Sequence, residues 1–115
     1  MVLTDRDLKK ASVSCPKNGL GKMDKTILLT EAEMFGKGKT FAKLILHPGC
    51  AMGFHMHDGD SEFYYILSGT GEYNDNGTIK CVNEGDLCAV SSGAGHSLKN
   101  TGDSDLTALA LILFS

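Results

Sequence analysis

After residue 40 the chain alternates between short apolar segments and turn-forming residues, and this alternation limits the fold more than any other feature. The segments are rich in β-branched and aromatic residues, and glycine, asparagine and aspartate separate them at intervals of about 8–12 residues. None of this part shows three turns of helical periodicity. The pattern therefore predicts an all-β sandwich or barrel.

Nine strands are expected from the apolar segments. They are Thr26–Thr30, Phe41–Leu46, a segment containing residues 55–57, Phe63–Leu67 opened by Glu62, Thr70–Tyr73, Thr78–Val82, Leu87–Val90, His96–Asn100 and Leu106–Phe114. The last is apolar on both faces, which predicts a central place in its sheet. Asp58–Asp60 and Asn74–Gly77 are the clearest turns, because glycine readily adopts a positive φ and aspartate and asparagine tolerate it.

The first 40 residues are less regular, and we expect an N-terminal extension with one or two strands over residues 1–40, followed by one barrel domain over residues 41–115. Residues 5–10 form either a single helical turn or a frayed terminus. Cys15–Gly21 is rich in helix breakers and predicts a loop, and Glu31–Lys39 predicts a turn or an irregular link. The extension is expected to pack on the barrel or on a second subunit. Since such pairing would cover sheet edges, we expect a homodimer.

Composition excludes several classes of function. A chain of 115 residues with a net charge of −3, ten scattered lysines and one arginine has no basic face for nucleic acid. No apolar run reaches about 18 residues, so no membrane-spanning helix is expected. The polar N-terminus does not resemble a secretion signal, and the four cysteines lack C-x-x-C spacing, so we expect a cytoplasmic protein with free thiols.

Two imidazoles and a carboxylate lie within eight residues. His55 and His57 point to the same face of a strand because side chains alternate along it. After a tight turn, Glu62 opens the next strand. These three groups from adjacent strands make three ligands of a mononuclear metal site. A fourth has to come from one of the two other histidines, His47 and His96.

Two motifs in the chain resemble those of the cupin superfamily. The first is G-x5-H-x-H-x4-E-x6-G, from Gly49 to Gly69, and the second is G-x5-S-x-G-x2-H-x3-N, from Gly85 to Asn100. Ser91 stands where the family usually has proline. The resemblance implies the cupin double-stranded β-helix, an antiparallel jelly-roll barrel, with a metal ion inside one mouth. It carries the family's ligands over to His55, His57, Glu62 and His96, and we expect His47 to be solvated.

The ligand set defines the expected cofactor and the range of functions. Three neutral imidazoles and one carboxylate suit one divalent transition metal per chain, which includes Mn, Fe, Co, Ni, Cu and Zn. Positions left open on the metal could take water, O₂ or a chelating ligand. The resemblance implies an enzyme that acts on a small carboxylate, sugar or other oxygen-chelating substrate. The alternative is a non-catalytic binding or sensor protein. Oxalate decarboxylases place an arginine against the substrate, but Arg6 lies outside the barrel region.

Strand parity suggests residues around the metal ligands. Tyr64 shares the face of Glu62 and is expected either to donate a hydrogen bond to substrate or to pack in the core. Cys88 is expected to line the cavity. Lys43 is a candidate anion partner if its side chain points into the barrel, and a solvated lysine is the alternative. Asn100 is expected to close a turn through side-chain hydrogen bonds.

Overall fold

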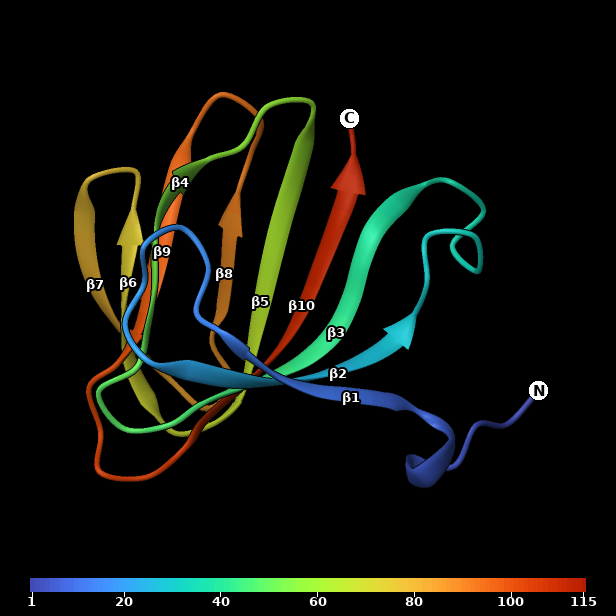
Figure 1. The fold of residues 1–115 in the computed structure, drawn as a ribbon. Coiled ribbons are helices and arrows are strands. Elements are labelled where there is room, and N and C mark those ends of the chain that lie inside the picture. Colours follow the sequence, from blue (N-terminus) through green and yellow to red (C-terminus); the bar gives the residue numbers. More distant parts are fainter.

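The computed structural model describes residues 1–115, and its regular secondary structure consists almost entirely of β-strands (Figure 1). A short 3₁₀ helix, η1 (Asp5–Asp7), precedes them. The strands are β1 (Lys9–Ser14), β2 (Lys22–Leu29), β3 (Gly38–Leu46), β4 (Ala51–Met56), β5 (Asp60–Ser68), β6 (Thr70–Asp75), β7 (Thr78–Asn83), β8 (Leu87–Val90), β9 (Gly95–Asn100) and β10 (Leu106–Phe114). None of the helical structure is long and apolar enough to cross a lipid bilayer.

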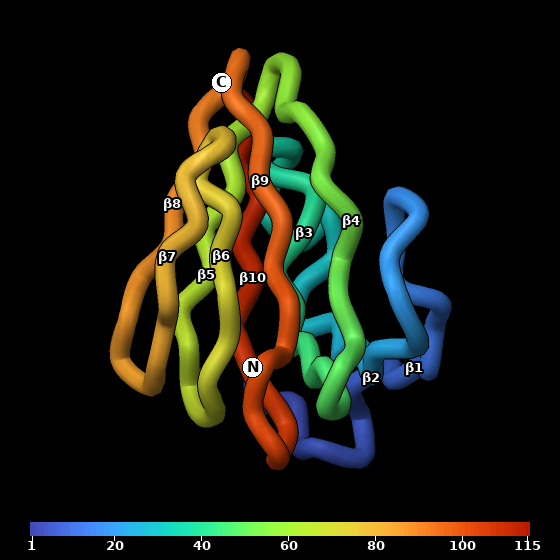
Figure 2. The backbone as a smooth tube through the Cα atoms, turned by 90° about the vertical axis from the view of Figure 1, so that its left-hand side faces the viewer, coloured from blue at the N-terminus to red at the C-terminus, as the bar shows by residue number.

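The strands form two antiparallel sheets that face each other. One sheet has six strands in the order β1-β2-β3-β10-β5-β8, and the other has four in the order β4-β9-β6-β7. Figure 2 shows the four-stranded sheet in front of the six-stranded one. The expected all-β cupin fold is confirmed. The expected N-terminal extension supplies β1 and β2, which continue the six-stranded sheet beyond β3.

The core fills the space between the sheets and follows the alternation of each strand. On β10, Leu106, Ala108 and Ala110 are each no more than 2% exposed, while the residues between them are only partly buried. β10 pairs with β3 on one side and with β5 on the other. The predicted central position of this strand is therefore confirmed.

The predicted turns have the expected backbone conformations. Asn76 and Gly77 join β6 to β7 with φ angles of 49° and 104°, and the side-chain oxygen of Asn74 accepts a hydrogen bond from the Gly77 N–H at 2.7 Å. Gly59 has a φ of 80° between β4 and β5. This reversal brings β5 back past the end of β4, which is what places Glu62 near the two histidines.

The N-terminal strands differ most from expectation. β1 is the second strand allowed for the extension, but the sequence does not locate it, because its residues are polar and its side chains are mostly exposed. It forms by pairing with β2 along its whole length, from Lys9 opposite Ile27 to Ser14 opposite Lys22. β2 begins four residues before the expected Thr26. Backbone pairing with a neighbouring strand defines both elements, and single-strand patterns do not contain that information.

Candidate metal centre

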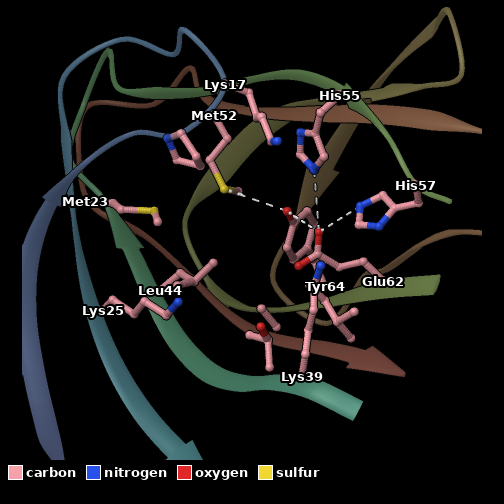
Figure 3. A pocket seen from close by; sticks show the side chains of 14 residues that line it. Lys17, Met23, Lys25, Lys39, Leu44, Met52, His55, His57, Glu62 and Tyr64 are labelled. Atoms are coloured by element: carbon pink, nitrogen blue, oxygen red, sulfur yellow. Dashed lines mark hydrogen bonds and ion pairs between the residues drawn. The ribbon is translucent and has the colours of Figure 1, made fainter. Parts of the chain in front are cut away.

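Four side chains from three strands converge at one end of the space between the sheets. His55 lies on β4, His57 directly after it, Glu62 on β5 and His96 on β9. One potential ligand atom from each lies within 4.8 Å of all the others. Figure 3 shows His55 and His57 directed at the Glu62 carboxylate. The register places His96 opposite His55 on the neighbouring strand.

The donor atoms of this cluster suit a cation. His96 Nε2 lies 3.1 Å from His55 Nε2, 3.1 Å from His57 Nε2 and 3.0 Å from Glu62 Oε1. Neighbouring ligands at right angles around a transition metal, with bonds of about 2.1 Å, are about 3 Å apart. Three nitrogens and one carboxylate oxygen facing each other this closely repel one another unless a cation or protons lie between them. The residues present therefore fit a divalent metal.

A buried carboxylate fixes the orientation of the His57 ring. His57 Nδ1 donates to Asp60 Oδ1 at 2.6 Å, which leaves Nε2 facing the cluster. The second oxygen of Asp60 pairs with Lys39 Nζ at 3.1 Å. Burial raises the pKa of Asp60, but the hydrogen bonds from His57 and Lys39 outweigh it and lower the pKa overall. Such partners orient metal-binding histidines and raise their basicity.

The other two rings are held by uncharged groups. His55 Nδ1 donates to the backbone oxygen of Gly53 at 2.8 Å. His96 Nδ1 shares a hydrogen bond of 2.9 Å with the hydroxyl of Tyr73. Each of the three rings is thus fixed through Nδ1, so all three Nε2 atoms are free to face the same point.

The pKa shifts of Glu62 and His96 favour metal ligation, whereas the shift of His55 favours its protonated form and opposes ligation. Burial raises the pKa of Glu62, but hydrogen bonds from His55 and His96 outweigh it and lower the pKa to about 2. Burial lowers the pKa of His96, which keeps that ring neutral. The pKa of His55 is raised by its hydrogen bond to Glu62, against the effect of burial. A carboxylate and neutral imidazoles are the forms that bind metals.

Tyr64 packs against the cluster with its hydroxyl satisfied. Its ring stacks on His96 with 5.1 Å between centroids, and its O–H donates to Glu62 Oε1 at 2.9 Å. Burial, and then the neighbouring Glu62 charge, raise the pKa of Tyr64 well above its ordinary value. The hydroxyl therefore remains a donor. This matches the core-packing alternative, although the residue also contributes to the cavity wall.

The other two residues expected near the site lie elsewhere. Cys88 is buried in the core opposite Tyr64, and burial raises the pKa of its thiol to about 11. Lys43 lies between Ala42 and Leu44, whose side chains are buried, so Lys43 points to the outer face of the sheet. The structure does not bring Lys43 to the site, because the alternate residues of β3, Ala42 and Leu44, face the core instead.

A cavity of about 190 Å³ opens beside the cluster. One wall is apolar and is formed by Met23, Leu44, Met52, Ala110 and Ile112. Apart from the residues of the cluster, the charged residues in the cavity wall are three lysines, Lys17, Lys25 and Lys39 (Figure 3). The volume is below the roughly 300–1,000 Å³ of sites for drug-sized ligands, so the cavity suits a small molecule.

Sequence reasoning missed several residues of the site. Asp60 has the strand parity of Glu62, so extending the predicted strand by two residues would have found it. Lys25 has the parity of Met23, but only a strand that starts at Lys22 reveals this. Tyr73 and Lys17 reach the site through tertiary packing, and no local pattern marks them.

The remaining two polar predictions concern residues outside the cluster. His47 is 45% exposed at its side chain and bonds to Asp105 and Asp24, so it takes no part in the site.

Asn100 is buried, and its side-chain oxygen accepts from the Gly102 N–H at 2.9 Å. The expected turn closure by Asn100 is confirmed.

Comparison with known proteins gives consistent matches. Residues 42–112 match the family model described as Cupin domain. An oxalate-binding protein of Thermotoga maritima is 38% identical over 113 residues, which cover 98% of this chain and 93% of that protein. The crystal structure of a predicted oxalate decarboxylase from the same organism has a TM-score of 0.95 and 37% identity, with 100% of both chains covered. The cupin domain of Schizosaccharomyces pombe Cnp3 shares the fold at 16% identity, with a TM-score of 0.72 over 86% of this chain and 69% of that one.

Proposed function

This chain belongs to the cupin family, and on that basis we propose that it is a metal-dependent binding protein for a small carboxylate ligand. The observation that carries the proposal is the convergence of three Nε2 atoms and one carboxylate oxygen beside a small cavity with a positively charged wall. A relative that spans nearly the whole chain is an oxalate-binding protein. Oxalate is therefore the first ligand to test.

The proposed metal ligands are His55, His57, Glu62 and His96. A divalent transition metal held by these groups would act as a Lewis acid toward a ligand oxygen. The protein orients three of the four ligands through Nδ1 and holds Glu62 through the Tyr64 hydroxyl. The apolar wall of the cavity lowers the local dielectric, which strengthens the attraction between the metal and an anionic ligand.

Binding is better supported than turnover. Glu62 is the only carboxylate in the cavity wall, and a metal would occupy it. Tyr64, with its raised pKa, cannot accept a proton. The second candidate is an enzyme. The four-ligand set with a cavity beside it favours this candidate, and the lysines of the wall could transfer a proton. A decarboxylase, dioxygenase or isomerase acting on an oxygen-chelating substrate would have this arrangement.

Elemental analysis followed by calorimetry tests the proposal. Protein purified without added metal, and protein reconstituted with Mn²⁺, Co²⁺ or Zn²⁺, should contain about one metal per chain because there is one cluster. Oxalate should bind to the metal-loaded protein and not to the metal-free protein. Formation of formate or CO₂, or consumption of O₂, would favour the enzyme. Absence of stoichiometric metal in every preparation would reject both candidates.

We also propose that the protein is a homodimer. β1 is the outermost strand of the six-stranded sheet, and its outer edge has no partner strand in the chain. Unpaired edges attract further strands unless another subunit or charged side chains protect them. Light scattering at micromolar concentration should give twice the chain mass of 12.3 kDa. A monomeric mass would leave the charges of Lys9 and Lys10 as the protection of this edge.

A further inference from the structure

All three lysines of the cavity wall come from the part of the chain that precedes the cupin match. Lys17 lies in the Cys15–Gly21 loop, Lys25 on β2 and Lys39 at the start of β3, whereas the family model begins at residue 42. The register pairs Lys25 with the buried Leu44, which directs Lys25 to the inner face of the sheet. The N-terminal residues therefore provide the positive charge of the cavity wall.

Two of these lysines lack a partner. Lys39 is paired with Asp60. Lys17 and Lys25 make no ion pair or side-chain hydrogen bond with any residue of the chain. Figure 3 shows the amine of Lys17 beside the His55 ring. Two unpaired ammonium groups that line one cavity repel each other and a metal bound in the cluster, which favours an anion between them.

The Cys15–Gly21 loop is built to hold Lys17 in place. Its backbone exchanges two hydrogen bonds with β4, between Leu20 and Ala51, and Pro16 O accepts a third from the Gly53 N–H at 3.0 Å. A Cβ added to Gly53 would lie only 1.7 Å from the Lys17 carbonyl oxygen, so glycine is required for this approach. Lys17 itself has a φ of 59°. Such a conformation is uncommon outside glycine and is often found at ligand sites.

The loop is also connected to a metal-ligand candidate. Gly53 donates to the loop through its N–H and accepts from His55 Nδ1 through its oxygen. One peptide segment thus sets the position of both Lys17 and His55. The position of the Lys17 backbone relative to the metal cluster is therefore set by β4.

We propose that Lys17 and Lys25 form an anion clamp that makes the metal site selective for dianions, which rests on the proposed function of the site. A divalent metal bound to Glu62 keeps one positive charge, and the two lysines add two more. A ligand that chelates the metal and carries a second negative charge pairs with both parts of the site, because the oxygens turned away from the metal can bond to the lysines. A monoanion of the same shape leaves the lysines unpaired.

Oxalate and oxamate test this clamp, because both chelate a metal through two oxygens and oxamate has one negative charge fewer. Calorimetry at fixed ionic strength would compare Mn²⁺-loaded wild type with K17Q, K25Q, the double variant and K22Q. Lys22 is exposed on the same strand as Lys25 and is outside the cavity wall, so K22Q controls for the change in net charge.

We expect oxalate affinity to fall about tenfold in each single variant, because each loses one charged hydrogen bond. The preference for oxalate over oxamate should fall about tenfold in the double variant, with metal content unchanged and K22Q like wild type. Retention of the wild-type preference in the double variant would overturn the clamp alone. Failure of wild type to bind metal, or to bind either ligand, would overturn the proposed function and the clamp with it.

Discussion

The metal cluster and the lysines of the wall share one cavity but are built in opposite ways. His55, His57, Glu62 and His96 lie within the family match, and each is fixed by a hydrogen bond to a neighbouring group. The lysines come from the first 40 residues, and two of them are unpaired. Under the proposed function, the part of the fold within the family match would hold the metal, while the N-terminal residues would select its ligand.

Removal of two of the proposed metal ligands should have the largest effect, which is the loss of bound metal. His57→Ala combined with Glu62→Ala leaves two of the four groups, which is too few to hold a divalent metal at micromolar concentration. Elemental analysis should find almost no metal, while circular dichroism shows an intact β-sheet protein. Full occupancy in this double variant would mean that the metal lies elsewhere.

The group that orients His57 should matter next. Asp60→Ala removes the acceptor of the His57 Nδ1 proton and leaves Lys39 unpaired. We expect metal affinity to fall by about 10–100-fold, as for other groups that orient metal ligands. A chelator competition titration would measure it, with Asp58→Ala as the control because Asp58 is exposed nearby. Equal affinities of the two variants would remove Asp60 from the site.

Gly53→Ala tests whether the loop and the cluster are connected. The new Cβ would collide with the Lys17 carbonyl oxygen, so the Cys15–Gly21 loop has to move. We expect a loss of about 1–3 kcal/mol in the free energy of unfolding, as for other overpacked sites. The oxalate preference should fall with it. Gly102→Ala is the control, because its Cβ would meet only ordinary contacts of 3.5 Å or more.

The smallest effect is expected at His47, the histidine outside the cluster. The hydrogen bond to Asp105, opposed in part by burial, raises its pKa above the ordinary 6.5. Because the pKa is raised, the His47–Asp105 pair contributes its full stabilisation of the fold at pH values below the ordinary pKa. This contribution is lost as the pH rises through the pKa of the folded state. Denaturant unfolding of metal-loaded protein at about pH 6 and pH 9 should show a small decline for wild type that His47→Gln lacks. Parallel curves would contradict the assignment.

Local patterns predicted the part of the site that lies on consecutive strands. His55, His57 and Glu62 follow from alternation and one tight turn, and the strand limits of β8 and β10 were predicted correctly. The failures concern contacts between distant segments. Lys43 was a candidate and Lys25 was not, because the inward parity of β2 and β3 depends on which face of each strand the sheet buries. No single-strand pattern contains that choice.

By itself the sequence determined an all-β domain, its turns and the convergence of His55, His57 and Glu62, because side-chain alternation and positive-φ residues act over a few neighbouring positions. Only the tertiary structure decided what surrounds those groups. Tyr73 orients the His96 ring, and Lys17 and Lys25 charge the cavity wall, through pairing of segments far apart in the chain. Such pairing depends on sheet order and loop docking, which arise from the packing of the whole molecule.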